Sequence, residues 1–252
     1  MKTIMLTLVL CLVISTTQAR EIPLSMMEKS VDDMYQGCIP QMDKKVKDVY
    51  FPREIKINPF NDAWKVSKKF AEKKYEKRPD KALTLNQVQA LYVYTQEFPN
   101  VYAEFNAIVR DGRAKYTTEA FQYHALHFWV STALQIVNEN KSCRTTYRRS
   151  KDKYTGKVNE EMRFGCFASS SKEPDLITFG QETCFYIETC LGADIGYYSK
   201  MSETESEVLI PPYERFKIKE IAEGSYKEMK DCKKVFVLKS TGKFCNLNCI
   251  AI

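Results

Sequence analysis

Two carboxylates stand two residues apart at the start of an apolar run. Glu205 and Glu207 precede Val208-Leu209-Ile210, and two prolines end the run. In a strand, residues i and i+2 point to the same face about 7 Å apart, so a strand here would aim both carboxylates into one cleft. Glycosyl transfer uses such a pair, because one carboxylate stabilises the cationic sugar and the other positions the nucleophile. The alternative is that both glutamates face water.

The first residues have the features of a secretory leader. Lys2 is followed by an apolar core, Ile4 to Ile14, and by a small-residue site that ends at Ala19. We expect residues 1–19 to be a signal peptide and 20–252 to form one domain outside the cytosol. No later stretch is long and apolar enough for a transmembrane helix, and no C-terminal spacer and apolar tail indicate a lipid anchor.

The net charge and several short motifs limit the classes of partner that the chain could bind. The net charge of +6 is modest, and the lysine doublets alternate with acidic residues, as on solvated helix faces. We expect no nucleic-acid partner, because that would need a denser basic stripe. Asn140 begins a glycosylation sequon. Cys249 fits the prenylation pattern, which we reject because prenylation is cytosolic.

The cysteine count favours disulfides. One of nine cysteines, Cys11, lies in the leader, which leaves eight. An even count in a secreted chain is typical of disulfides, although eight cysteines allow 105 pairings. Zinc is the alternative, but no Cys-x2-Cys pair accompanies a histidine pair. We read His124 and His127 as packing or capping residues and expect no metal.

The two halves of the chain differ in their pattern of apolar residues. Helical spacing occurs at 61–71, after the capping box that begins at Thr84, at 101–109 and at 117–137. After Cys143, segments rich in β-branched and aromatic residues predict strands, with a hairpin turn at 240–243. These segments are 163–171, 176–180, 183–192, 207–221 and 233–249. Helices followed by strands predict an α+β domain.

Further residues upstream of the glutamate pair carry a resemblance. Arg148 and Ser169 lie on expected strands and precede Glu205-x-Glu207. This order resembles the R-S-E-x-E signature of the vertebrate-type ADP-ribosyltransferases that use NAD and modify arginine. Five blocks between residues 84 and 221 resemble the family in order: "FQYHALHFWVSTALQIV", "CRTTYRR", "RFGCFASSS", "FGQETCFYIETCLGADI" and "SEVLIPPYERFKI".

The resemblance implies NAD-binding roles. Arg148 would hold the diphosphate or the adjoining ribose, which suits a forked, permanently charged donor. Ser169 would bond the nicotinamide-side ribose or hold the catalytic glutamate. Phe179 would stack on the nicotinamide ring. Tyr94 would approach NAD from a helix. The alternatives are a surface arginine at 148 and core packing at 94 and 179.

The resemblance also implies a separate role for each of the two carboxylates. Glu207 would stabilise the oxocarbenium ion as nicotinamide leaves, and Glu205 would orient the acceptor guanidinium. The implied disulfides are Cys143–Cys190 and Cys38–Cys245, with Cys166–Cys184 and Cys232–Cys249 as further pairs.

Three departures from the family pattern bear on the reaction. Arg149 stands where the family has glycine and would crowd a close approach. Cys166, before Phe167, stands at a position that is often polar in the family, and one more residue than usual separates the Tyr197-Tyr198-Ser199 stretch from Glu207. The expected activity is transfer of ADP-ribose from NAD to arginine of a protein, with release of nicotinamide. The alternatives are an NAD glycohydrolase and an inactive secreted binding protein.

Overall fold

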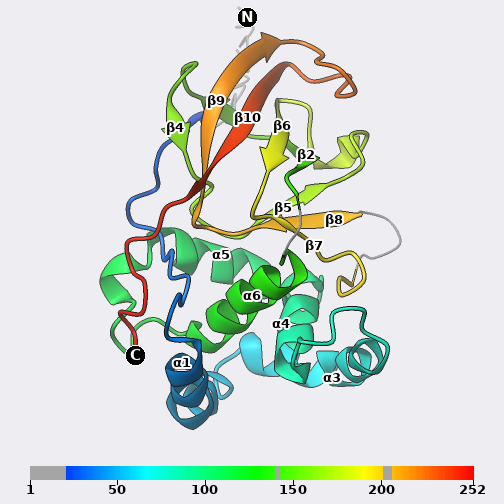
Figure 1. The fold of residues 1–252 in the computed structure, drawn as a ribbon. Helices are drawn as coiled ribbons and strands as arrows, with labels where there is room; N and C mark the ends of the chain where they lie inside the picture. The colour runs from blue at the N-terminus through cyan, green and yellow to red at the C-terminus, as the bar shows by residue number, and fades with distance from the viewer. Residues whose placement is uncertain (1–20, 140–141, 201–205) are drawn as a thin grey trace, which may run out of the picture.

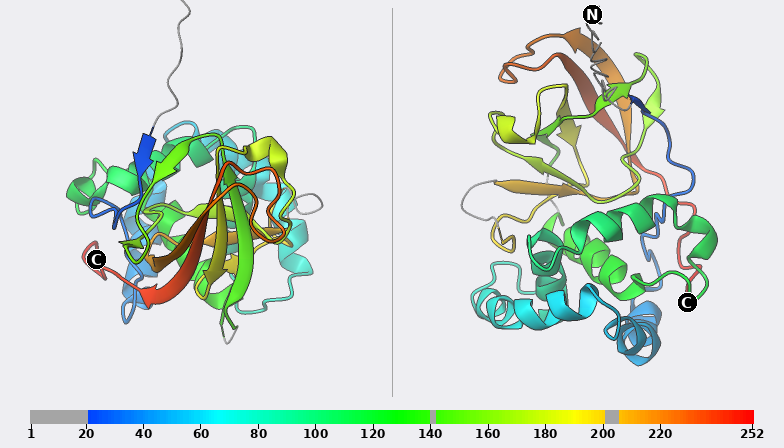
Figure 2. Two further views of the ribbon diagram at one scale, coloured as in Figure 1. Left: turned by 90° about the horizontal axis from the view of Figure 1, so that it is seen from above. Right: turned by 180° about the vertical axis from the view of Figure 1, so that it is seen from behind.

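The fold was obtained as a computed structural model that describes residues 21–139, 142–200 and 206–252. Helices form one body and a twisted sheet forms the other, with the sheet above the helices in Figure 1 and again in the view from behind in Figure 2. This arrangement confirms the expected α+β class, with a helical front half and a strand-rich back half.

The helical half is built from six α-helices and two short helical turns within the described ranges. They are α1 (Ile39–Lys45), η1 (Val46–Tyr50), α2 (Phe51–Glu54), α3 (Phe60–Glu76), α4 (Leu85–Thr95), α5 (Tyr102–Asp111), η2 (Arg113–Lys115) and α6 (His124–Val137). The predicted capping box starts α4: Thr84 Oγ1 accepts from the Gln87 N–H, and Gln87 Oε1 accepts from the Thr84 N–H.

The strands follow from Arg144 onward, apart from β1. They are β1 (Glu21–Pro23), β2 (Arg144–Ser150), β3 (Lys153–Thr155), β4 (Glu161–Met162), β5 (Ala168–Ser171), β6 (Thr183–Thr189), β7 (Ala193–Asp194), β8 (Glu207–Ile210), β9 (Glu214–Glu223) and β10 (Lys234–Lys243). The main sheet has the order β4-β9-β10-β6-β2-β5-β8-β7. Only β6 and β10 pair in parallel among its described strands. This order places β2, β5 and β8 side by side.

A buried carboxylate fixes the start of α6, the most buried helix. Both oxygens of Glu54 accept backbone N–H groups of its first turn, from His124 and Ala125, each at 2.9 Å. These N–H groups have no partner within a helix, and a carboxylate there also complements the helix dipole. Glu54 therefore starts α6 at His124, not at the expected residue 117, and the residues before it form turns.

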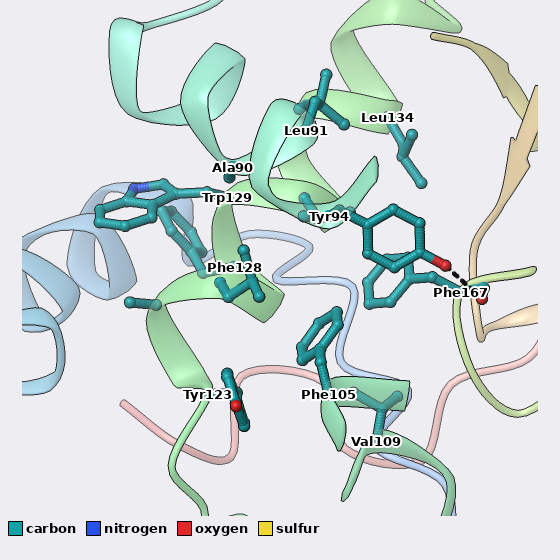
Figure 3. Close-up of a cluster of buried hydrophobic side chains, with 14 of the residues drawn as sticks. Ala90, Leu91, Tyr94, Phe105, Val109, Tyr123, Phe128, Trp129, Leu134 and Phe167 are labelled. Carbon is teal, nitrogen blue, oxygen red and sulfur yellow. Dashed lines mark hydrogen bonds between the residues drawn. The ribbon is translucent and has the colours of Figure 1, made fainter. Parts of the chain in front are cut away.

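Aromatic packing joins α4, α5 and α6 to the sheet. Figure 3 shows Tyr94, Phe105 and Phe128 in one buried cluster, which Phe167 joins from the segment before β5. The rings of Phe105 and Phe167 stack at 5.5 Å, and Tyr94 Oη donates to the Phe167 carbonyl at 2.8 Å. The helical half thus positions the chain that enters β5.

Two predicted elements differ from the structure. Residues 176–180 do not form a strand, because η3 (Ile177–Phe179) is a 3-10 turn that ends at Gly180. Gly180 has φ +132, and a Cβ there would lie 2.2 Å from the Ser150 carbonyl carbon. The expected hairpin turn at 240–243 is wrong as well, because these residues continue β10 through an irregularity in its pairing with β9.

The disulfides correct part of the expected pairing. Cys143–Cys190 is present as expected, but Cys38 pairs with Cys249 and Cys184 pairs with Cys232. Cys166 and Cys245 are free thiols. The expected Cys38–Cys245, Cys166–Cys184 and Cys232–Cys249 pairs are therefore wrong. The disulfide also gives Cys249 a role other than prenylation. Within the described ranges, the helices are all too short or too polar to cross a membrane.

Candidate active site

A cavity of about 560 Å³ lies where β2, β5 and β8 meet the C-terminal end of α4. Five of the six residues proposed from the sequence line it. The proposed residues in the lining are Tyr94, Arg148, Ser169, Phe179 and Glu207. The sheet order explains this convergence, since strands far apart in sequence are neighbours in space.

Arg148, Ser169 and Glu207 form a connected chain across three strands. Arg148 Nη1 donates to the Ser169 carbonyl at 2.6 Å, and Ser169 Oγ donates to Glu207 Oε1 at 2.8 Å. Ser169 lies opposite Leu209 in the antiparallel β5–β8 pair, which brings the start of β8 alongside the end of β5. The three signature residues are thus assembled at one wall of the cavity.

A second serine holds the other oxygen of the carboxylate. Ser199 Oγ donates to Glu207 Oε2 at 2.9 Å. Glu207 is only 4% exposed, so hydrogen bonds replace the water that burial removes. No role was expected for Ser199, which ends the Tyr197-Tyr198-Ser199 stretch in a loop eight residues before Glu207.

The two aromatic candidates occupy different positions. Phe179 ends η3, is 49% exposed and lies at the cavity lining, where its ring is accessible to a planar ligand. Tyr94 is buried, and its hydroxyl donates to the Phe167 carbonyl and accepts from Asn106 at 3.0 Å. The Tyr94 hydroxyl therefore has a packing role, while its ring contributes to the lining.

Glu205 lies outside the described residues. The expectation that it shares a strand face with Glu207 stays a prediction; in the described part of the chain, β8 begins at Glu207 and Ser206 before it has φ +44. A residue in the left-handed region interrupts the alternation of an extended strand. The relation of Glu205 to the cavity is therefore a proposal.

The side chain of Arg149 turns away from Arg148, as alternation along β2 requires. Its guanidinium donates to the Pro174 carbonyl at 2.7 Å and the Lys230 carbonyl at 2.9 Å. It also lies 3.4 Å from Cys232 Sγ. The expected crowding by a long side chain is thus relieved, and Arg149 instead fastens the loop that leads to Phe179.

The histidines lie within the helical core, as expected. His124 contacts Glu54 and the Tyr116 carbonyl, and His127 Nδ1 is 2.6 Å from the Tyr35 hydroxyl. Burial lowers the pKa of His127 to about 3, so its ring is neutral. In the part of the chain that the structure describes, no cluster of three or more His, Cys, Asp or Glu side chains could hold a metal ion.

A family model described as NAD:arginine ADP-ribosyltransferase matches residues 24–244. The chain belongs to this family. It is 30% identical to the erythroblast NAD(P)(+)–arginine ADP-ribosyltransferase of Gallus gallus over 91% of this chain and 76% of that protein. It is 33% identical to GPI-linked NAD(P)(+)–arginine ADP-ribosyltransferase 1 of Mus musculus, over 79% of this chain and 66% of that one.

Solved structures of family members share the fold. The crystal structure of the mono-ADP-ribosyltransferase ART2.2, as a glutamate-to-alanine variant in complex with NADH, matches 92% of this chain and all of that chain. The TM-score is 0.77 and the identity 27%. The fold, the enzyme class and NAD as substrate are therefore confirmed, and this member of the family transfers ADP-ribose to arginine. The mouse relative is described as GPI-linked, which is a feature of cell-surface proteins.

Proposed function

We propose that the mature chain transfers ADP-ribose from NAD to an arginine of a protein, with the described cavity as its active site. The observation that carries the proposal is the chain of hydrogen bonds from Arg148 through Ser169 to Glu207 inside that cavity. A half-buried arginine on β2 and a buried carboxylate on β8, with β5 between them, supply one group for phosphate and one for a sugar cation.

NAD binding would use Arg148 and Phe179, which both line the cavity. Arg148 has one N–H on the Ser169 carbonyl, and its other donors have no partner among the described residues, so they suit the diphosphate oxygens. Phe179 would stack on the cationic nicotinamide ring. With the diphosphate and the nicotinamide held by this lining, the bond between nicotinamide and ribose would lie close to Glu207, which lines the same cavity.

The reaction breaks the bond between nicotinamide nitrogen and ribose C1′. The bonding electrons leave with neutral nicotinamide, and the ribose carries positive charge that the Glu207 carboxylate stabilises. A guanidinium nitrogen of the acceptor then bonds to C1′ and loses a proton. Fixed hydrogen bonds from Ser169 and Ser199 keep the carboxylate oriented while this charge develops.

Glu205 is proposed to bind the acceptor guanidinium. Its place two residues before Glu207 supports this role, as does membership in an arginine-modifying family. Glu205→Gln should abolish transfer to agmatine, a small arginine mimic, while slow NAD hydrolysis remains. Equal loss of transfer and hydrolysis would contradict the role, and Glu207→Gln is the control that should abolish both.

We also propose that the chain is a secreted enzyme of one domain. The leader-like residues 1–19 and the three disulfides support export to an oxidising compartment. Expression in cultured animal cells should place the chain in the medium. Retention at the cell surface until a phosphatidylinositol-specific phospholipase is added would instead show an anchored form.

A further inference from the structure

A row of four lysines runs along the exposed side of α3. Lys65, Lys69, Lys73 and Lys77 follow one another at a spacing of four residues, which places them on one helix face over about 18 Å. We name this set the α3 lysine row. Lys77 directly follows the last helical residue, and all four lysines are exposed.

The α3 lysine row is only partly neutralised by its own helix, where Glu72 and Glu76 follow Lys69 and Lys73 by three residues. Residues 65–77 contain six lysines and two glutamates, Glu72 and Glu76. None of the four lysines forms an ion pair with a described carboxylate. Like charges four residues apart weaken a helix slightly, so an anionic partner bound along the row would relieve this repulsion.

Two apolar side chains interrupt the positive surface. Val66 is 53% exposed and Phe70 49% exposed, on the edge of α3 beside the row. Phe70 stacks on Tyr92 at 5.5 Å, so its ring has a fixed orientation. Cations around accessible apolar groups are typical of a surface for a protein partner, because both charge and apolar area contribute to docking.

A short segment links the flank of α3 beside the row to the active site. Lys74 of α3 lies over the Tyr197 ring at 4.9 Å, and Tyr197 Oη donates to the Lys74 carbonyl at 3.2 Å. Lys200 lies 5.9 Å from the Phe70 ring. Between them, Ser199 holds Glu207. One short segment, 197–200, therefore touches α3 on one side and the catalytic carboxylate on the other.

We infer that the α3 lysine row docks an acidic surface of the protein acceptor, so that the enzyme favours an arginine flanked by carboxylates. This inference rests on the proposed function and specifies its substrate class. The Glu207 carboxylate in the cavity attracts the positively charged guanidinium. The α3 lysine row attracts the acidic groups around the acceptor arginine. The negative charge in the cavity and the positive charge of the α3 lysine row together fix the orientation of the acceptor.

Two synthetic peptides test the inference. Each carries one arginine, followed in one peptide by a run of glutamates and in the other by glutamines. The native enzyme should modify the glutamate peptide with a kcat/KM about tenfold higher at low ionic strength, and salt should remove this preference. Lys69→Glu/Lys73→Glu should abolish the preference and leave transfer to agmatine within about twofold, because agmatine has no acidic flank.

The matched control reverses two exposed lysines on the sheet half. Lys157→Glu/Lys219→Glu makes the same change in net charge far from α3 and should keep the preference. Equal rates on both peptides with the native enzyme, or a preference that survives in the Lys69→Glu/Lys73→Glu variant, would overturn the inference. Binding of heparin that depends on the α3 lysine row, without any difference in rate between the two peptides, would also overturn it. The partner would then be a sulfated polysaccharide. Absence of agmatine transfer by the native enzyme would identify failure of the proposed function itself.

Discussion

At the residue scale, two serines from different segments hold the two oxygens of Glu207. Ser169 comes from β5, beside β8 in the sheet, and Ser199 comes from the loop after β7. A carboxylate with both oxygens bound has little freedom to rotate away from a developing positive charge. Fixed donors of this kind are a means of preorganising a site.

Removing the Ser199 hydroxyl should therefore slow chemistry more than binding. Ser199→Ala is expected to lower kcat about tenfold, because a hydrogen bond to a charged group is lost, and to leave the KM for NAD within about threefold. Ser199→Thr should restore most of the rate because it keeps the hydroxyl. Steady-state measurement of nicotinamide release checks both variants. A rise in KM at unchanged kcat would show that Ser199 serves binding instead.

The signature residues were accessible from the sequence because each stands in a recognisable block. Arg148, Ser169 and Glu207 meet in one cavity as expected. Ser199 was not accessible, because its contact depends on how the loop after β7 folds back. The role of Arg149 was misjudged for a similar reason: the sequence shows that the side chain is long, but only the pleat of β2 shows where it points.

At the element scale, Arg149 fastens two loops to β2. Its hydrogen bonds to Pro174 and Lys230 hold the loop that carries Phe179 and the loop before β10. Arg149→Ala should lower the free energy of unfolding by about 3 kcal/mol, because two buried charge-assisted bonds are lost. The KM for NAD should rise because the Phe179 loop loosens.

Arg149→Lys is the matched variant, since it keeps the charge and loses the fork that reaches both carbonyls. Its free energy of unfolding, measured by urea denaturation, should lie between that of the native chain and that of Arg149→Ala. Native-like stability and KM in Arg149→Ala would show that the loops are held by other contacts.

The buried His127 of α6 is expected to make the stability of the fold depend on pH. Burial lowers the pKa of His127 to about 3, against 6.5 for a free histidine. Between these values the unfolded chain binds a proton that the folded chain does not, so stability falls as pH drops through this window. The stability that the neutral His127 contributes is fully present above about pH 6.5. The contribution is at most about 1.4 kcal/mol per pH unit.

A neutral substitute should remove this dependence. His127→Gln is expected to be less stable at pH 7, because packing is disturbed, yet to lose less stability than the native chain between pH 6.5 and 4.5. Urea denaturation at several pH values gives the two slopes. Parallel slopes would mean that His127 does not titrate in this way.

Element types were largely accessible from periodicity, but some boundaries were not. The β-branched and aromatic residues at 176–180 predicted a strand, yet the close approach of Gly180 to Ser150 produces a turn. The start of α6 depends on Glu54, which lies seventy residues before His124. Long-range contacts of this kind leave no local pattern.

At the scale of the whole molecule, one disulfide joins the two ends of the described chain. Cys38 and Cys249 are 211 residues apart, and Tyr50 Oη donates to the Ala251 carbonyl nearby. Spacing alone could not identify this pair, since Cys245 lies only four residues from Cys249 and is free. The fold decides which of the two reaches Cys38.

Removal of this cross-link should destabilise the molecule and spare the cavity. Cys38→Ser/Cys249→Ser should lower the free energy of unfolding by about 2–5 kcal/mol, because the unfolded chain regains freedom over a long loop. The KM for NAD should stay within about twofold of the native value. Cys245→Ser is the control and should have native stability. Destabilisation by Cys245→Ser equal to that of the double variant would contradict the pairing.

The most direct test of the central claim is nicotinamide release from NAD by the mature, oxidised chain, with and without agmatine. We expect release that rises with agmatine, formation of ADP-ribosyl-agmatine, and loss of both in Glu207→Gln, which should still bind NAD. Release that does not respond to agmatine would show hydrolysis in place of transfer. No release from a folded, fully disulfide-bonded sample, or native rates in Glu207→Gln, would contradict the assignment of this cavity as the active site.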